Sequence, residues 1–353
     1  MVFKIVIRQT YELINLKKLE NNVKTIVNSS SNYKYHIAVV KANCYGLGIK
    51  CVKSILLGGA NYLAVSSLEE ALKIRKITNT RILVLEPIDT KYIDKAYKNN
   101  ITLTISSLEY LNKVKNKEFT CHLKINTGMN RLGISSNKEL NEVYKIIKES
   151  NIKLEGIYTH IYKSGDKILT EKQFKCFESI TKDIDLNKFE IVHIPNSETI
   201  TNYKKKDYVN GCRMGIIMYG FSNNLNLESI FTLKSKIIEI KHIKDGDTVG
   251  YDGNYKTTKD ELIGIVPIGY ADGIIRKNTG RYVYINNNRY QIIGNICMDM
   301  LFILIDNKVK LNDEVLIIKD NNHINEIANH LDTINYEVMC DVSSRVERKY
   351  TER

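Results

Sequence analysis

A lysine at the end of a short apolar run is the residue of this chain best suited to nucleophilic chemistry. Residues 36–40 are typical of a buried parallel strand that ends at Lys41, and Tyr45, Gly46 and Gly48 follow. Burial at a strand end favours the neutral lysine amine, which attacks carbonyl groups such as an aldehyde. The glycines would let the backbone approach a phosphate closely. A lysine that extends to solvent has the same local pattern, so other residues must decide.

Polar residues and glycines also mark the ends of four later apolar runs. They are Lys124 and Arg131, then His160, then Asn196 and Ser197, and finally Arg213, Gly215 and Ile216. Each has a simpler interpretation, such as a surface arginine, a core histidine, a helix N-cap or a turn glycine. In a barrel of parallel strands, however, the carboxyl ends of all strands meet on one face, where chemistry takes place. We therefore expect these side chains to lie together.

The spacing of apolar runs predicts the fold that would bring them together. Eight short runs, most followed by a helical pattern, cover residues 35–40, 62–65, 81–85, 101–105, 120–125, 154–159, 191–194 and 209–214. This alternation predicts the α/β class, with an N-terminal (β/α)8 TIM-like barrel over residues 10–230. An open doubly wound sheet stays possible, although no GxGxxG motif follows the first strand.

The pattern changes after residue 230, where a mostly-β domain is predicted over residues 231–353. Alternating runs at 231–242, 282–285, 291–293, 302–305 and 315–318 are separated by Asp-Gly, Asn-Asn-Asn and Asp-Asn-Asn-His sequences typical of turns. Residues 1–9 are expected to add a strand to this domain.

Composition excludes several classes of protein. The 353 residues carry a net charge of +12, but the lysines are spread along the chain, which argues against a nucleic-acid interface. No apolar stretch is long enough to span a bilayer, and the N-terminal run is too short for a signal peptide. Seven scattered cysteines without a CxxC pair predict neither a disulfide framework nor a zinc site. We expect a cytoplasmic protein that binds no metal.

Seven sequence motifs resemble the alanine racemase family, which has the fold type III architecture and depends on pyridoxal 5′-phosphate. They are VVKANCYGLG, HLKINTGMNRLGI, GIYTH, NS, RMGIIMYG, VPIGYADG and GNICMDM, in the family's order. The last two motifs, VPIGYADG and GNICMDM, lie in the predicted second domain. A protein that consists of the cofactor-binding barrel alone lacks this domain, so the two motifs make the resemblance specific to the family. The resemblance implies interconversion of L- and D-alanine, with D-alanine supplied for peptidoglycan.

The resemblance also implies a role for each residue of the site. Lys41 would form the Schiff base with the cofactor, and Arg213 would face its pyridine nitrogen. The cofactor phosphate would be bound by Tyr45, Ser197, Gly215 and Ile216. Arg131 would bind the cofactor phenolic oxygen and the substrate carboxylate, braced by Lys124, which is often carbamylated in the family. Asn196 and Asp299 are expected to support the site.

Racemisation needs a base on each face of the substrate α-carbon. Lys41 would serve one face, and the resemblance assigns the other to Tyr270, linked to Arg213 through His160. A free tyrosine has a pKa of about 10, and a nearby imidazole and guanidinium would lower it. In the family this tyrosine and the loop containing Met298, whose backbone helps to bind substrate, come from a partner subunit. A homodimer with shared active sites is therefore implied.

Four positions depart from the family pattern. Asn126 replaces the usual aspartate, Asp166 is shifted by one position, Asn295 replaces an arginine of the entry passage, and Ser344 replaces a phosphate-contacting tyrosine. Because these positions affect the entrance and the cofactor support, a serine or broad-specificity racemase is an alternative on the same scaffold. A non-catalytic protein that binds pyridoxal phosphate and a decarboxylase of similar build are alternatives of other classes.

Overall fold

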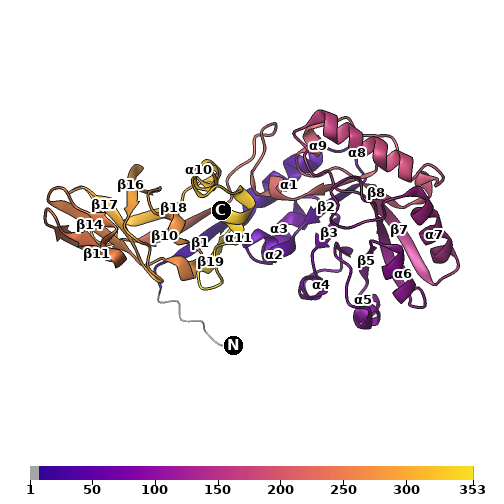
Figure 1. The fold of residues 1–353 in the computed structure, drawn as a ribbon, viewed down its shortest axis with the longest axis horizontal. Helices are drawn as coiled ribbons and strands as arrows, with labels where there is room; N and C mark the ends of the chain where they lie inside the picture. Colours follow the sequence, from indigo (N-terminus) through magenta and orange to yellow (C-terminus); the bar gives the residue numbers. More distant parts are fainter. Residues whose placement is uncertain (1–7, 353) are drawn as a thin grey trace. The chain divides into compact units, whose positions relative to one another are not determined.

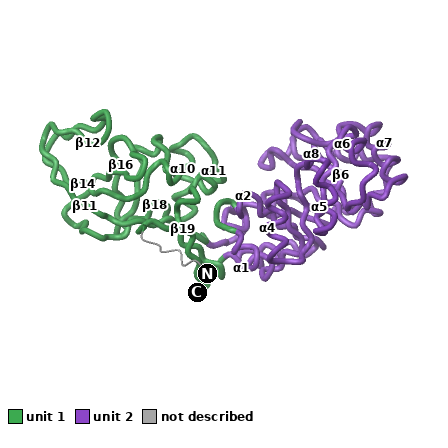
Figure 2. Tube along the Cα trace, turned by 90° about the horizontal axis from the view of Figure 1, so that it is seen from below, with its two compact units in different colours: residues 1–18, 45–48, 229–353 green, residues 19–44, 49–228 purple. Residues whose placement is uncertain are grey.

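The chain divides into two compact units. In the computed structural model, which describes residues 8–352, the barrel unit comprises residues 19–44 and 49–228 (Figure 2). The β unit comprises residues 1–18, 45–48 and 229–353. The predicted boundary near residue 230 thus lies close to the change between units. Residues 10–18 and 45–48, which the sequence places with the barrel, pack instead with the β unit.

Eight parallel strands close the barrel, as the alternating pattern predicts (Figure 1). Neighbouring strands pair in sequence order, and the last strand pairs with the first. The strands are β2 (Tyr35–Val39), β3 (Tyr62–Val65), β4 (Ile82–Val84), β5 (Ile101–Ile105), β6 (Phe119–Lys124), β7 (Ile152–Tyr158), β8 (Ile191–His193) and β9 (Gly211–Met214). The predicted fold class is therefore confirmed.

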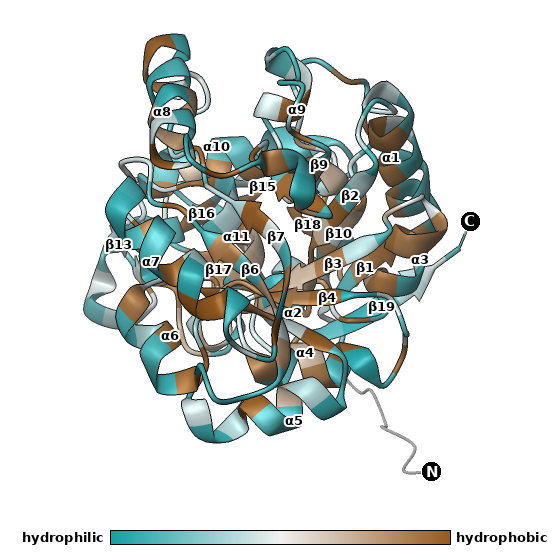
Figure 3. Cartoon of the chain, turned by 90° about the vertical axis from the view of Figure 1, so that its right-hand side faces the viewer, coloured by the Kyte–Doolittle hydropathy of each residue, from teal (hydrophilic) through white to brown (hydrophobic). Residues whose placement is uncertain are grey.

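Serine N-caps begin several of the helices that connect these strands. Ser67, Ser107 and Ser136 each accept a hydrogen bond from the backbone N–H three residues later. The helices are α1 (Leu16–Ser29), α3 (Cys51–Leu57), α4 (Leu68–Arg75), α5 (Ile93–Lys98), α6 (Leu108–Val114), α7 (Asn137–Lys148), α8 (Lys167–Ile180) and α9 (Thr199–Asn202). In Figure 3 strands β3 and β4 are largely hydrophobic, whereas helices α4 to α7 carry both hydrophobic and hydrophilic residues. Burying one face of each helix on the strands forms the core.

A nine-stranded sheet forms most of the β unit, in the order β11-β14-β17-β16-β15-β18-β10-β1-β19. Its strands are β1 (Tyr11–Asn15), β10 (Phe231–Lys236), β11 (Glu239–Ile243), β14 (Glu261–Val266), β15 (Tyr282–Ile285), β16 (Asn288–Ile293), β17 (Leu301–Ile305), β18 (Glu314–Ile318) and β19 (Glu347–Thr351); β12 (Thr248–Val249) and β13 (Tyr255–Lys256) form a separate pair. Strand β1 pairs with β10 and β19, which is why the residues before α1 belong to this unit.

Two expectations for the β unit need correction or lie outside the described residues. The strand expected over residues 1–9 falls mostly outside them; the strand that joins the sheet is β1. The expected turn at residues 320–323 is the start of helix α10 (Asn321–Leu331), because the Asp320 side chain accepts a 2.9 Å hydrogen bond from the His323 amide. A second helix, α11 (Asn335–Cys340), follows it. No helix in the described part of the chain is long and apolar enough to cross a membrane.

Candidate active site

Lys41 lies directly after β2, at the carboxyl end of the barrel, and begins an unusual turn. The four residues that follow it, Ala42 to Tyr45, all have positive φ angles between 50° and 57°. Each non-glycine residue in this left-handed conformation costs about 1–2 kcal/mol. The Ala42 amide donates a 2.6 Å hydrogen bond to the Glu70 carboxylate, which helps to stabilise the turn. Strain of this kind is concentrated at functional sites.

Arg213 on β9 is the most extensively bonded cation of the barrel unit. It is 4% exposed, and its terminal nitrogens donate to His193 Nδ1 and O, both at 2.8 Å. They also donate to Thr159 O at 2.8 Å and Ile194 O at 2.9 Å, and one lies 3.4 Å from His160 Nδ1. Among the described residues Nε has no hydrogen-bond acceptor. The guanidinium is thus fixed in place with one donor left for a ligand.

A chain of buried polar groups continues from Arg213 into the barrel. His193 Nε2 lies 2.9 Å from His122 Nδ1, and His122 Nε2 lies 2.9 Å from Glu155. Glu155 also accepts from Tyr62 at 2.6 Å and from Arg81 at 2.9 Å. Burial lowers the pKa of both histidines. Burial opposes ionisation of Glu155 as well, but its hydrogen-bond donors hold its pKa at about 2. Sequence reasoning missed this chain, although its members interrupt apolar strands.

Lys124, Arg131 and His160 line one small cavity of about 10 Å³. Burial, followed by the charges of Arg213 and Arg131, lowers the pKa of His160 to about 3, so its imidazole is neutral at pH 7. Burial and the Arg131 charge lower the pKa of Lys124 to about 8. Tyr158 lies beneath this cluster, because Lys124 Nζ and Arg213 Cζ each lie 5.6 Å from the centre of its ring. Sequence reasoning missed Tyr158 as well.

Ser197 and Gly215 meet across neighbouring strand ends. The Gly215 amide donates a 2.9 Å hydrogen bond to Ser197 Oγ, so Ser197 is not the N-cap of α9. The Asn196 side chain donates to Ile161 O at 3.0 Å and accepts from the Thr199 amide at 3.2 Å. It thereby fixes the turn that carries Ser197. Ile216 begins the 3₁₀ turn after β9, one residue from this contact.

The remaining predicted residues lie together in the β unit. The Tyr270 amide donates to Cys297 O and the Ala271 amide to Met298 O, both at 3.0 Å. A side chain on Gly269 would come within 2.5 Å of Met298 O, so the close approach requires glycine. The Tyr270 and Met298 side chains are 41% and 52% exposed. Asp299 forms a 2.6 Å ion pair with Arg345, which holds the loop that contains Met298.

Tyr45 also belongs to the β unit, although it lies four residues after Lys41. Its ring centre lies 5.9 Å from that of Tyr336. The two nearby glycines are required by contacts within this unit, since a side chain on Gly46 would lie 2.7 Å from Met339 O and one on Gly48 would collide with the Tyr350 hydroxyl. A phosphate is therefore not needed to explain them.

Local contacts account for three of the four departures from the family pattern. Asn126 accepts from the Gly128 and Asn130 amides at 3.2 and 3.0 Å and donates to Ser135 Oγ, so the asparagine closes its own turn. Asp166 is the N-cap of α8 and accepts from the Leu169 amide. Asn295, which is 8% exposed, donates to Tyr251 O at 2.9 Å. Ser344 is exposed, and nothing in the structure explains it.

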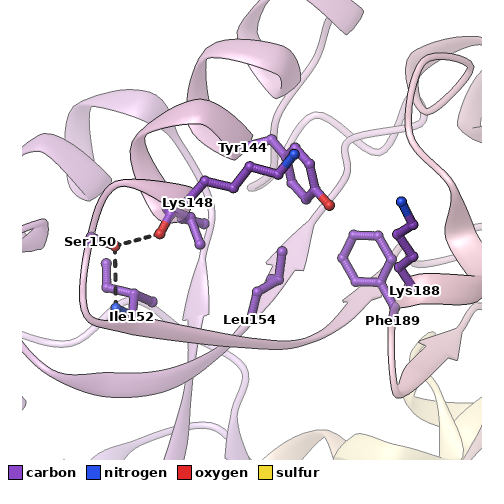
Figure 4. Close-up of a pocket in the computed structure, with 8 residues that line it drawn as sticks. Tyr144, Lys148, Ser150, Ile152, Leu154, Lys188 and Phe189 are labelled. Carbon is purple, nitrogen blue, oxygen red and sulfur yellow. Dashed lines mark hydrogen bonds between the residues drawn. The ribbon is translucent and has the colours of Figure 1, made fainter.

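A larger cavity of about 320 Å³ lies elsewhere in the barrel unit (Figure 4). Tyr144, Leu154 and Phe189 line it, and Ser150 closes one side by donating to Ile147 O at 2.8 Å. Because it lies near the start of β7, whereas His160 follows the end of that strand, it is at the opposite end of the barrel from Lys41. It contains none of the predicted site residues.

Comparisons with known proteins agree with both units. Residues 14–223 match the model of the alanine racemase N-terminal domain, and residues 230–350 match that of the C-terminal domain. The chain is 35% identical to "Alanine racemase 1" of Bacillus subtilis over 98% of this chain and 94% of that protein. The structure is similar to alanine racemase from Bacillus anthracis with bound L-Ala-P, with a TM-score of 0.91, 31% identity and coverage of 98% and 96%. Alanine racemase from E. faecalis gives a TM-score of 0.92 at 30% identity, with coverage of 99% and 100%. The chain therefore belongs to the alanine racemase family.

Proposed function

We propose that this protein interconverts L- and D-alanine with pyridoxal 5′-phosphate as cofactor and supplies D-alanine for peptidoglycan. Family membership over nearly the whole chain supports the reaction. The observation that carries the proposal is the arrangement of Arg213, His160 and Lys124 at one end of the barrel, where Lys41 also follows its strand. Such an arrangement attracts anions and contains an amine for carbonyl chemistry.

The residues of the barrel end are suited to hold this cofactor. Arg213 Nε has no acceptor among the described residues, so it can donate to a pyridine nitrogen. Arginine stays charged and has no acceptor, so it leaves that nitrogen unprotonated. Because Ser197 Oγ accepts from the Gly215 amide, the Ser197 hydroxyl could donate to a phosphate bound beside the Gly215 and Ile216 backbone. The chemistry that the cofactor would supply is withdrawal of electrons from the α-carbon of a substrate whose amine has replaced Lys41 on it.

Two residues would move the proton in this reaction. Lys41 Nζ would remove or return the α-proton on one face once substrate has replaced it on the cofactor, and Tyr270 Oη would do so on the other face. A base on each face allows inversion, which a single base does not favour. The neutral imidazole of His160 would accept a hydrogen bond, and so connect the tyrosine to Arg213.

The substrate carboxylate would be bound by Arg131 and the Met298 backbone. Lys124, whose pKa is lowered to about 8, would brace Arg131. A substantial neutral fraction of its amine at neutral pH is the form that reacts with carbon dioxide, which agrees with carbamylation at this position. Asn196 and Asp299 would support the turns that carry the binding groups.

The exposed part of the β unit supports a homodimer. Tyr270 and Met298 are well exposed for residues of an active site, although their backbones are firmly bonded. We propose that residues 10–230 bind the cofactor and that residues 231–353 complete the active site of a partner subunit. The substrate would be a small amino acid.

Incubation of L-alanine with the protein in D₂O tests the function. We expect deuterium at the α-carbon together with formation of D-alanine, because both bases exchange protons with solvent. Absorbance of bound cofactor without exchange would instead identify a non-catalytic binding protein, and release of CO₂ would identify a decarboxylase. An alanine preference over serine of less than tenfold in kcat/KM, about 1.4 kcal/mol, would contradict the assignment to alanine.

A further inference from the structure

Arg348 on β19 is the centre of an unassigned group of contacts in the β unit. Its guanidinium donates to four backbone carbonyls: Gly46 O at 3.1 Å, Val342 O and Ser343 O at 2.5 Å, and Val346 O at 2.8 Å. Its side chain is 13% exposed. One charged side chain thus joins residues that are about 300 positions apart in the sequence.

A buried carboxylate lies behind this arginine. Glu12 on β1 is completely buried, and its carboxylate lies 3.0 Å from Arg348 Nε. A buried charge is tolerated only where an opposite charge and hydrogen bonds compensate for lost solvent. Burial raises the pKa of Glu12 to about 7, and the charge of Arg348 opposes this shift. Arg348 Nε donates to Gly46 O and not to Glu12, so the arginine is held by the carbonyls while Glu12 is its buried neighbour.

On one side Arg348 holds the segment that carries Tyr45. It binds Gly46 O, while the neighbouring Tyr350 donates from its hydroxyl to Leu47 O at 2.9 Å. The segment follows a run of strained left-handed residues, so it needs such external contacts to keep one conformation. Tyr45 is the residue proposed above to bind the cofactor phosphate.

On the other side Arg348 holds the residues against which the Tyr270 turn rests. Ser343, whose carbonyl accepts from Arg348, donates from its amide to Asp272 O at 3.0 Å and from its hydroxyl to Ala271 O at 2.9 Å. The backbone of Asp341 approaches Gly273 so closely that a side chain there would collide with it. The turn that carries Tyr270 is thus packed on the segment that Arg348 fixes.

We propose that Arg348, through its hydrogen bonds to these carbonyls, is a positioning residue that sets both the Tyr45 segment and the Tyr270 turn. This inference rests on the proposed function, because it assigns these two segments to cofactor binding and proton transfer. Arg348 would act through these segments, because its guanidinium donates to backbone carbonyls. Its loss should weaken cofactor binding through Tyr45 and slow proton transfer at Tyr270, whereas a merely structural arginine would change stability alone.

Arg348→Lys tests the proposal, since lysine keeps the charge beside Glu12 but cannot reach four carbonyls at once. Titration of the apoprotein with pyridoxal 5′-phosphate should show a dissociation constant raised at least tenfold. Exchange of the α-proton of L-alanine in D₂O should fall about tenfold at saturating cofactor. Glu12→Gln should give smaller changes in the same direction, because it removes only the neighbouring acid and leaves the four carbonyl contacts of the arginine in place.

Arg281→Lys provides a matched control in the same unit. Arg281 is 4% exposed and donates to Tyr282 O and Ile317 O, so its replacement removes comparable contacts without touching either segment. We expect a similar loss of thermal stability with unchanged cofactor affinity. Equal effects of the two arginine variants on cofactor affinity would overturn the proposal.

Tyr350→Phe keeps the test decisive if Arg348→Lys does not fold. It removes only the hydroxyl that holds Leu47, and should raise the cofactor dissociation constant while leaving proton exchange at saturating cofactor unchanged. An unchanged dissociation constant would contradict the role of these contacts. Failure of the proposed function is recognised separately, because the wild-type protein would then bind cofactor without racemising alanine.

Discussion

The predicted site residues form two groups, one in each unit, whose side chains have different surroundings. In the barrel unit, buried hydrogen bonds hold Arg213, and burial together with nearby cations lowers the pKa of Lys124 and His160. In the β unit, Tyr270 and Met298 have exposed side chains on a backbone that is tightly bonded. The first part has a fixed electrostatic environment, and the second presents groups to a surface.

This difference separates binding from proton transfer. A buried cluster of cations can bind a phosphate and a carboxylate strongly, because low dielectric strengthens the attraction. An exposed tyrosine does not share that environment until another surface covers it. We therefore expect changes at the barrel cations to affect cofactor and substrate binding together, and changes at Tyr270 in the β unit to affect mainly the rate.

The largest effect is expected for Lys41→Ala in the barrel unit. It removes both the amine that binds the cofactor and one of the two bases, so kcat should fall by at least about 10³-fold. The visible absorbance of the lysine-bound cofactor should disappear as well. Lys50→Ala, which changes an exposed lysine near the same turn, should leave both unchanged. More than a tenth of wild-type activity in Lys41→Ala would show that another residue is the nucleophile.

Tyr270→Phe in the β unit should have the next largest effect, and it should change the rate of racemisation alone. Loss of one base should slow removal of the α-proton from L-alanine by about 10²–10³-fold. Cofactor affinity should stay within twofold of wild type, since the change keeps the ring. Measurement of deuterium exchange from each alanine isomer checks the assignment, with Tyr251→Phe at another exposed tyrosine as control. Near-normal racemisation would refute the two-base mechanism.

Part of the stability that the protein loses in acid should come from His160 in the barrel unit. Burial and nearby cations lower the pKa of His160 to about 3, so the unfolded chain binds a proton there below about pH 6.5 while the folded chain does not. This contribution lowers stability as pH falls from 6.5 towards 3, and amounts to about 2 kcal/mol at pH 5.

Urea unfolding of His160→Gln at two pH values measures this contribution. The variant should lose about 2 kcal/mol less than wild type between pH 7 and pH 5, because glutamine does not titrate. Between pH 7 and pH 8 both proteins should change equally, since the imidazole is neutral in both states. A variant that loses as much stability in acid as wild type would show that His160 is protonated in the folded protein.

The smallest effects are expected at two asparagines, one in each unit. Asn126→Asp removes hydrogen bonds donated to Asn130 and Ser135 but keeps the accepting oxygens, so it should cost about 1 kcal/mol or less. Asn295→Asp would place a carboxylate beside Asp252, to which the asparagine now donates at 3.0 Å, and should cost about 1–2 kcal/mol. Thermal unfolding compares them. A larger loss of stability for Asn126→Asp than for Asn295→Asp would show that the Asn126 turn tolerates substitution less well than the Asn295 site.

Periodicity revealed the barrel strands because all of them are short, apolar and separated by polar segments. Helices were harder to predict from the sequence, because α5 is only six residues long and α10 begins with asparagines that are also typical of turns. Chemistry-bearing residues at strand ends could be listed from the sequence, since polar groups there stand out. Buried partners such as His122, Glu155 and Tyr158 could not, because side chains that bond across the barrel come from different strands.

The sequence alone determined the family, the order of elements and the residue types available for chemistry. Only the tertiary structure decided which contacts hold these residues in place. Arg213 is oriented by acceptors from two segments, after β7 and at β8, and the glycines after Lys41 are required by the C-terminal residues of the β unit. The physical reason is that hydrogen bonds and close contacts depend on distance in space, whereas a sequence pattern records only local preference and burial.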